Sequence, residues 1–341
     1  MLYMLIIPVL LVFVLLFIVY NRVRLPVNVN SLINEIKKEE LPEFVTGKTG
    51  FANNNDIKIA YEILDSKKPN GETIVLISGL GQSRLVWPTY FYQPFLDQGY
   101  NIIIFDNRGL GESDWIMDWT KENLYSLEEM ATDAIAVLDA LNITQAHFVG
   151  MSMGGMISQR IAISHPTRIL TLTSVMSTGF YGDPDLVSVS KTFYANIIGV
   201  TLLYARKLKT DAQKMKFVLS NQRLLKGKGD YKIDNKKILQ KAYYEIIKRK
   251  GFNWKVSDQH SMAIKISGSR YEELKNIKTP SLVIHGINDP LIKIEHAKKY
   301  ATLIPNAKTL FIKGMGHDLP EKYIPDIFKS ILKIITLNST N

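Results

Sequence analysis

The sequence predicts an α/β protein whose central sheet is mostly parallel and carries helices on both faces. From about Phe51 onward, short β-branched runs alternate with longer segments of helical periodicity, as in successive βαβ units. Most of the short runs are continuously apolar, which is typical of strands covered by helices on both sides. The chain has 341 residues, of which 46% are hydrophobic and 22% charged, and these values are ordinary for a globular core.

The individual elements follow from these patterns. Ile57–Leu64 alternates in polarity and is expected to be the first strand. The later strands are expected at Thr73–Ile77, Asn101–Phe105, Ala146–Val149, Ile169–Ser174, Ser281–Ile284 and Lys308–Lys313. Helices are expected at Leu127–Leu141, Met153–Ile163, Ile294–Leu303 and Ile324–Ile335. Ser126 followed by Glu129 predicts a capping box at the start of the first of these helices.

Two segments depart from the alternation. Leu2–Tyr20 is a run of 19 residues without a charge, so we expect a transmembrane anchor with its basic flank over residues 1–24. A cleaved signal peptide would show a basic start and a small-residue cleavage site, and neither is present. Residues 180–269 have helical periodicity and little strand character, which predicts a helical cap inserted between two parts of the core, 25–179 and 270–341.

The net charge of +10 is concentrated in one segment of the chain. Between Arg206 and Lys250 there are 15 Lys and Arg against 4 Asp and Glu, a local charge of +11. On an anchored protein this segment favours contact with anionic lipid headgroups, and a solvated helical face is the alternative. No nucleic-acid-binding motif is present, so we expect no nucleic-acid partner. Arg22 and Arg24 follow the apolar run, which favours an outside N-terminus and a cytoplasmic globular domain.

Residues 150–155, GMSMGG, place one serine among glycines between an expected strand and an expected helix. This is the context of a G-x-S-x-G nucleophile elbow, and a plain tight turn is the alternative. Gly150 and Gly154 would allow close backbone packing, while Ser152 would have to accept unfavourable backbone angles. A serine hydroxyl reacts when a neighbouring base takes its proton. We therefore expect Ser152 to be the nucleophile.

The expected base is His317, because GMGHD is a Gly-flanked loop directly after the last expected strand. His285 ends an expected strand and lies near the same edge of the sheet, but an acid follows it too closely for a clear role. The remaining histidines are interpreted as structural, with His147 in a strand core, His165 at a helix end, and His260 and His296 at cap and surface-helix positions.

The base requires a carboxylate that holds its tautomer. Asp289, in HGINDP, follows the second strand after Ser152, whereas the first of these strands leads to no acid. Asp318 is the alternative, but side chains that are adjacent in a loop rarely form the oriented pair. Asp289 also gives the chain order Ser, Asp, His of a hydrolase elbow.

An oxyanion requires two N–H donors that are already in position. We expect one from the backbone of Met153, the residue after the nucleophile. The other is expected from Leu80 in the loop SGLGQS, where Gly79 and Gly81 allow the amides to turn inward. Taken alone, this loop would also fit a plain turn.

These motifs together resemble the α/β-hydrolase superfamily over about Phe51–Ile335. FDNRGLGESD is similar to that superfamily's loop after the fourth strand, and the resemblance implies that Asp106, Arg108 and Ser113 brace this turn. GMSMGGMISQRIAISHPTRILTLTSVMST and GMGHDLP resemble bacterial serine esterases of the aclacinomycin-methylesterase and Lip-type carboxylesterase group. Ser78 stands where the superfamily's oxyanion loop usually has a histidine, and an N-terminal anchor is not part of the usual pattern.

The resemblance implies hydrolysis of a small-molecule carboxylic ester through an acyl-enzyme on Ser152, with no metal or organic cofactor. Other reactions of the same triad are the alternatives, namely C–C hydrolysis, thioester or lactone cleavage and cofactor-free perhydrolysis. A third class is a binding protein on a hydrolase fold. The apolar cap stretch Asn196–Ala205 is interpreted as cap core or as an entrance for lipid-like acyl chains.

Overall fold

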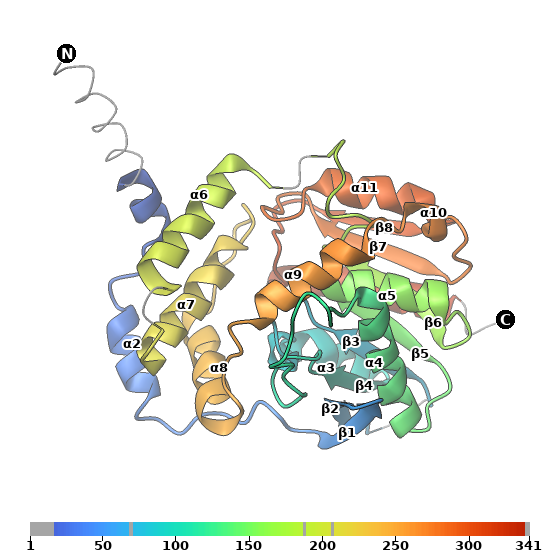
Figure 1. Ribbon diagram of the computed structural model, residues 1–341, viewed down its shortest axis with the longest axis horizontal. Coiled ribbons are helices and arrows are strands. Elements are labelled where there is room, and N and C mark those ends of the chain that lie inside the picture. Colours follow the sequence, from blue (N-terminus) through green and yellow to red (C-terminus); the bar gives the residue numbers. More distant parts are fainter. Residues whose placement is uncertain (1–16, 68–70, 187–188, 206–207, 338–341) are drawn as a thin grey trace, which may run out of the picture.

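A computed structural model describes residues 17–67, 71–186, 189–205 and 208–337. Within these residues, an eight-stranded sheet has the order β1-β2-β4-β3-β5-β6-β7-β8 (Figure 1). The strands are β1 (Lys48–Asn54), β2 (Ile57–Leu64), β3 (Thr73–Ile77), β4 (Asn101–Phe105), β5 (Ala146–Met151), β6 (Ile169–Val175), β7 (Ser281–Gly286) and β8 (Lys308–Ile312). β2 pairs antiparallel with both β1 and β4, and all other neighbours pair parallel. The predicted, mostly parallel sheet is confirmed.

Helices cover both faces of this sheet, as predicted. One core is formed with α4 (Leu127–Ala140), α5 (Met153–Ser164) and α11 (Ile294–Leu303), and the short α10 (Tyr271–Leu274) joins it. The other face packs against α3 (Thr89–Asp97) and α12 (Ile324–Thr336). β3 and β5 are buried along their whole length, because helices lie above and below them.

The element boundaries agree with the predicted ones at some ends and differ at others. α4 begins at Leu127 because Ser126 and Glu129 form the expected capping box. β5 runs to Met151 rather than Val149, and β7 runs to Gly286 rather than Ile284. Ser152 therefore follows its strand directly, and His285 lies inside a strand instead of at its end. β1, α2 and α3 were not predicted.

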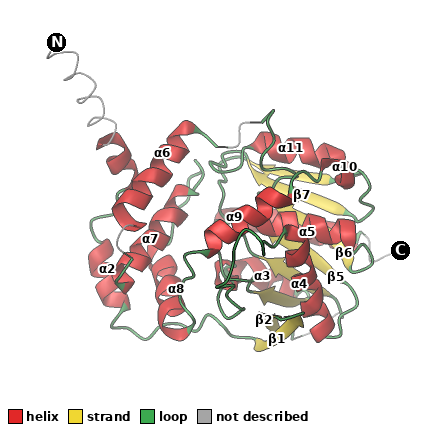
Figure 2. Cartoon of the chain, in the orientation of Figure 1, coloured by secondary structure: helices red, strands yellow, loops and turns green. Residues whose placement is uncertain are grey.

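A second group of helices stands beside the sheet (Figure 2). It contains α6 (Lys191–Val200), α7 (Asp211–Leu224), α8 (Asn235–Lys248) and α9 (Val256–Ser267), with a π-helical turn at Thr201–Ala205. In this part of the chain the described residues form helices and no strand. α2 (Val29–Ile36) packs against α7 and α8 in a core separate from the sheet. α9 crosses from this group to the sheet-bearing part, where Ala263 joins the core of α4 and α5.

The described chain begins with a helical segment, residues 17–23, beside α6. Gly199 lies at their contact, since a Cβ there would approach Val19 Cγ1 to 2.5 Å. Most of the predicted anchor Leu2–Tyr20 lies outside the described residues. Within the described part of the chain, no helix has the length and apolar character required to cross a membrane.

Candidate active site

Ser152 is the single residue between the end of β5 and the start of α5. Its backbone angles are φ 53° and ψ −119°, a conformation that costs free energy for any residue except glycine. Hydrogen bonds from both neighbouring segments hold it there: the Ser152 N–H donates to Val175 O at 2.8 Å, and Ser152 O accepts from Ser177 Oγ at 2.7 Å and from the Gly155 N–H at 3.0 Å. The turn therefore presents the Ser152 side chain at the carboxyl edge of the sheet.

Two glycines allow this turn to fit. A Cβ on Gly150 would lie 2.1 Å from Gly154 O, and a Cβ on Gly154 would lie 2.1 Å from Ile77 O. Both distances are far below any real contact and involve backbone atoms, which cannot move aside without disturbing the sheet. Only glycine at both positions lets the first turn of α5 rest on β3 and β5.

His317 and Asp289 meet in the loops that follow β8 and β7. His317 Nδ1 lies 2.7 Å from Asp289 Oδ2, and both side chains are buried. The other carboxylate oxygen accepts from the N–H groups of Leu291 and Ile292, each at 2.8 Å. A carboxylate can only accept here, so Nδ1 carries the proton and Nε2 is left to accept one.

The surroundings of Asp289 favour its charged form. Burial acts to raise the pKa of Asp289, but the charge and hydrogen bond of His317, together with the Ile292 N–H, lower that pKa below its ordinary value. His285 lies inside β7 and donates from Nε2 to Ile292 O at 2.9 Å. Burial lowers the pKa of His285, so this imidazole stays neutral and serves the Asp289 loop.

Asp318 turns away from His317 toward the cap. Tyr231 Oη lies 2.8 and 2.9 Å from its two carboxylate oxygens, and the Gly316 N–H donates to it at 3.1 Å. Burial raises the pKa of Asp318 to about 6, although these two hydrogen bonds oppose the rise. Asp289, rather than its sequence alternative Asp318, is hydrogen-bonded to His317.

The loop after β3 packs directly on Ser152. A Cβ on Gly79 would lie 3.3 Å from Ser152 Cβ, so the backbone of Gly79 and Leu80 adjoins the serine. Within the described residues, neither the Leu80 N–H nor the Met153 N–H has a hydrogen-bond acceptor. Met153 also opens α5, whose N-terminal end carries partial positive charge. Two free donors and a helix terminus thus lie beside Ser152.

His260, on α9, fastens this loop and is a candidate functional residue that the sequence did not reveal. The Gly81 N–H donates to His260 Nδ1 at 3.2 Å, and His260 Nε2 donates to Arg108 O at 3.0 Å. The interpretation of His296 as a surface-helix residue is wrong, because its side chain is fully buried, and His260, interpreted as a cap residue, is fully buried as well. Burial lowers the pKa of His260 to about 4, so it bridges the two loops in its neutral form.

A signal for His260 does exist in the sequence. The buried residues of α9 are Val256, Gln259, His260 and Ala263, which recur at helical spacing. Placing this stripe toward the core would have marked the histidine as buried.

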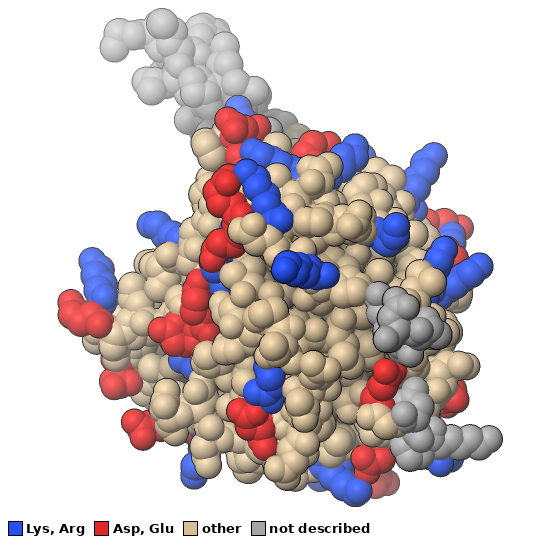
Figure 3. All heavy atoms as spheres, turned by 90° about the vertical axis from the view of Figure 1, so that its right-hand side faces the viewer, with Lys and Arg blue, Asp and Glu red and all other residues tan. Residues whose placement is uncertain are grey.

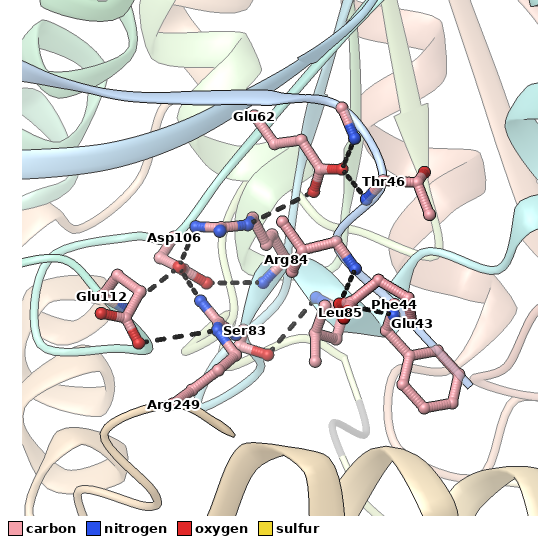
Figure 4. A network of polar contacts seen from close by, with 12 residues as sticks. Glu43, Phe44, Thr46, Glu62, Ser83, Arg84, Leu85, Asp106, Glu112 and Arg249 are labelled. Carbon is pink, nitrogen blue, oxygen red and sulfur yellow. Dashed lines mark hydrogen bonds and ion pairs between the residues drawn. The ribbon is translucent and has the colours of Figure 1, made fainter. Parts of the chain in front are cut away.

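Asp106 ties the core to the cap through a buried network of charges (Figure 4). One Asp106 oxygen accepts from the Arg84 N–H at 2.8 Å, and the other pairs with Arg84 Nη1 at 2.7 Å and with Arg249. Arg249 follows α8 and also pairs with Glu245 at 2.7 Å. Ser113 Oγ donates to Asp106 O at 2.6 Å and closes the turn.

Arg108 fixes the next part of the same turn. Its Nε and Nη2 each lie 2.7 Å from a carboxylate oxygen of Asp133 on α4, and Nη2 also donates to Glu129 O at 3.2 Å. Because the Arg108 carbonyl accepts from His260, this bidentate pair also fixes the position of the bridging histidine.

The charge network leads to a prediction about stability. We expect Arg249→Met to lower the free energy of unfolding by about 3 kcal/mol, because it leaves Asp106 and Glu245 buried with fewer partners. Urea unfolding followed by circular dichroism measures this loss. Lys248→Met, at an exposed neighbouring position, is the matched control and should change little. Equal stability of the two variants would contradict a structural role for the network.

The α7–α8 loop forms one wall of the site. The His317 N–H donates to Leu225 O at 2.8 Å, and the Gly229 N–H donates to Gly314 O at 2.8 Å. Gly227 rests on the His317 loop, since a Cβ there would lie 2.2 Å from Gly314 O. The loop that carries His317 is thus in backbone contact with the cap.

This arrangement provides the parts required for acyl transfer. A hydroxyl lies on a strained turn, an imidazole is held by a buried carboxylate, and two N–H donors are free beside the hydroxyl. Among the described residues, no three His, Asp or Glu side chains are placed to hold a metal ion.

Comparison with known proteins agrees with this geometry. Residues 72–322 match the family described as alpha/beta hydrolase fold. The chain belongs to this family. This α/β hydrolase is 30% identical over 267 residues to rhodomycin D methylesterase DauP of Streptomyces sp. (strain C5), with 74% of the chain and 87% of that protein covered. It is 29% identical to rhodomycin D methylesterase DnrP of Streptomyces peucetius, with the same shares covered.

A solved structure also shows the fold. A hydrolase from Pseudomonas aeruginosa PA01 has a TM-score of 0.60 and 21% identity to this α/β hydrolase, and the match covers 84% of the chain and 97% of that structure. The predicted α/β-hydrolase fold and the resemblance to its esterase group are confirmed, and the chain is a hydrolase of this type.

Proposed function

We propose that this α/β hydrolase is a serine carboxylesterase that acts on apolar, lipid-like esters. The observation that carries the proposal is the buried 2.7 Å contact between His317 and Asp289, in loops at the same carboxyl edge of the sheet as the strained turn of Ser152. Methylesterase relatives at 29–30% identity support ester hydrolysis as the reaction.

The proposed reaction has two steps. Ser152 Oγ attacks the ester carbonyl carbon while His317 Nε2 takes the hydroxyl proton, and Asp289 stabilises the resulting imidazolium. The N–H groups of Leu80 and Met153 bind the tetrahedral oxyanion. When the intermediate collapses, the leaving alkoxide takes the proton from His317 and departs as an alcohol. Water then gives a proton to His317 and attacks the acyl-enzyme. As this second intermediate collapses, the bond between the acyl carbon and Ser152 Oγ breaks, His317 returns the proton to Ser152 Oγ, and the acid is released.

The preference for apolar substrates is supported by the surface of the cap. Ile198, Leu202 and Leu203, on α6 and the turn after it, are 58%, 46% and 43% exposed. Val200 on the same stretch is buried, so the apolar run Asn196–Ala205 both packs the cap and presents apolar surface. Exposed apolar groups of this kind favour contact with acyl chains.

The experiment that tests the function uses the full chain in a neutral detergent with p-nitrophenyl esters of graded acyl length. We expect kcat/KM to rise from short to medium and long chains. The same panel includes a thioester, a lactone and a diketone, which represent the other reactions of such a triad. Faster turnover of any of these, or no ester turnover, would overturn the proposal.

His260 is proposed to position the oxyanion loop. We expect His260→Ala to lower kcat about 10- to 100-fold with a smaller change in KM, below the 10²–10³-fold cost of losing a donor outright. His147→Ala is the matched control. His147 is also buried, but it lies at the start of β5, at the end of that strand opposite Ser152, where it bonds Thr171. An equal loss of kcat in both variants, at temperatures where both are folded, would show that His260 acts only through stability.

The same residue predicts a dependence of stability on pH. Since burial lowers the pKa of His260 to about 4, only the unfolded state binds a proton there between pH 6.5 and 4. Proton uptake by His260 therefore favours the unfolded state as the pH falls through this window, and it lowers the free energy of unfolding by up to about 3 kcal/mol. The difference in unfolding free energy between wild type and His260→Ala should shrink from pH 7 to 4 in urea titrations. A constant difference would contradict a neutral His260.

We also propose that Leu2–Tyr20 anchors the enzyme in a membrane with its catalytic domain on the cytoplasmic side. The uncharged run, followed by Arg22 and Arg24, supports this orientation. In sealed spheroplasts, added protease should leave a C-terminal tag intact. Cleavage of the tag without lysis would place the domain outside.

A further inference from the structure

Two cavities of the described chain lie where the N-terminal segment meets the cap. The larger has a volume of about 520 Å³ and lies between residues 20–30 and the helical layer of α7. The other, of about 420 Å³, lies beside the C-terminal end of α7 and the loop that follows it. Both are lined by Arg22 and Arg223, so these two arginines stand between the cavities.

The linings carry positive charge only. Six cationic side chains line one or both cavities, and no Asp or Glu lines either: Arg22, Arg24, Lys216, Arg223, Lys226 and Lys232. In the described part of the chain, none of the six forms an ion pair. Arg223 Nη1 donates only to Asn235 Oδ1 at 3.2 Å, and Lys226 Nζ donates to Gly229 O at 3.3 Å.

Basic residues of the neighbouring helix α8 and its C-terminal end have acidic partners. Lys236 pairs with Glu35 at 2.7 Å and with Glu39 at 3.0 Å, and Arg249 pairs with Glu245. On the face of the molecule turned away from this helical group, basic and acidic side chains are interspersed (Figure 3). Like charges that share a hollow repel one another, and a bound anion removes that repulsion.

The cavity also offers groups suited to a phosphate. Arginine guanidinium groups bind phosphate oxygens in pairs, and lysines add charge. Tyr204 Oη accepts the Leu25 N–H at 3.1 Å, which leaves its own proton to donate into the larger cavity. Tyr20, which lines this cavity, is the last residue of the uncharged run, and Phe17 just before it is 66% exposed. An apolar segment therefore adjoins the basic cavity. A lipid whose headgroup binds in the cavity could place its acyl chain against that segment.

We propose that the two cavities form one binding site for a phosphate-bearing anion, supplied by the headgroup of an anionic lipid. Arg22 and Arg223 contact the phosphate from both cavities, and the other four cations surround it. Neither cavity is lined by Ser152, Asp289 or His317, and the proposal does not rest on the reaction proposed for Ser152. A cluster of this size next to an apolar segment selects anionic over zwitterionic lipids.

The test measures lipid selection by the full chain in neutral detergent micelles that contain phosphatidylglycerol or phosphatidylcholine. Native mass spectrometry gives the dissociation constant for each lipid. Arg22→Gln/Arg223→Gln should weaken phosphatidylglycerol binding about tenfold or more. Lys298→Gln/Lys329→Gln removes the same charge from exposed positions on α11 and α12 and is the matched control. Lys216→Gln/Lys232→Gln, one residue from each cavity, is a second variant, and thermal melting checks that all of them fold.

Each outcome decides the proposal. Preferential binding of phosphatidylglycerol that both cavity variants lose and the control keeps would support a lipid headgroup site. A second result is that the protein binds inorganic phosphate, loses this binding in Arg22→Gln/Arg223→Gln, and shows no preference between the two lipids. This result would support the anion site but assign free phosphate, rather than a lipid, as its ligand. Equal affinity for the two lipids without phosphate binding, or equal losses in the control and the cavity variants, would overturn the site.

Discussion

Ester turnover by Ser152→Ala is expected to fall about 10⁴- to 10⁶-fold, the largest effect of any single substitution in this protein. Alanine removes the only group that the proposed reaction makes covalent. The Ser152 N–H can still donate to Val175 O, and Ser152 O can still accept from Ser177 Oγ, because neither bond involves the Ser152 side chain. The residual rate reflects the free N–H donors and substrate binding. Steady-state kinetics with the best p-nitrophenyl ester measure the change.

A fluorophosphonate probe gives an independent readout of the same substitution. Wild type should carry one adduct on Ser152 by peptide mass spectrometry, and Ser152→Ala should carry none. Ser164→Ala, at an exposed position on the last turn of α5, is the matched control and should label as wild type does. If Ser152→Ala labels or turns over at the wild-type level, another residue is the nucleophile.

The second large effect is expected at the carboxylate. Asp289→Asn should lower kcat about 10⁴-fold, because an amide presents a donor to His317 Nδ1, reverses its tautomer and leaves the imidazolium without a counter-charge. The loop itself should remain, since the amide oxygen can still accept from the Leu291 and Ile292 N–H groups. Kinetics and urea unfolding of the same preparation separate activity from stability.

Asp318→Asn provides the comparison within the same loop. Its side chain accepts from Tyr231 Oη and the Gly316 N–H, and an amide oxygen keeps an acceptor for these donors. We therefore expect a mild effect on kcat. The reverse order, with a mild Asp289→Asn and a severe Asp318→Asn, would assign the role of carboxylate to Asp318.

The sheet could be predicted because its strands carry the pattern that their environment demands. β3 and β5 are apolar throughout since helices cover both faces, and this requirement is visible in five or six consecutive residues. β1 was missed because it is a mostly polar edge strand, KTGFANN, held by its ladder with β2. α2 was missed because its three buried residues pack on α7 and α8, far away in the sequence.

The candidate site likewise has residues that the sequence could predict and residues that it could not. Ser152, Asp289 and His317 lie in loops at the carboxyl ends of strands, where the order of elements places them together. The contributions of the cap could not be predicted. Contacts from Leu225 to His317 and from His260 to Gly81 join segments that share no local pattern, and they depend on how the helices pack.

The backbone contact between the α7–α8 loop and the His317 loop limits how this protein can be recombined with its relatives. Gly227 has no room for a side chain against Gly314, and Leu225 supplies the acceptor for the His317 N–H. A chimera that receives a foreign cap would retain all three predicted catalytic residues and still lose the alignment of its histidine. Exchanges should therefore move the cap and residues 314–318 as one unit, even though some 90 positions of sequence separate Leu225 from His317.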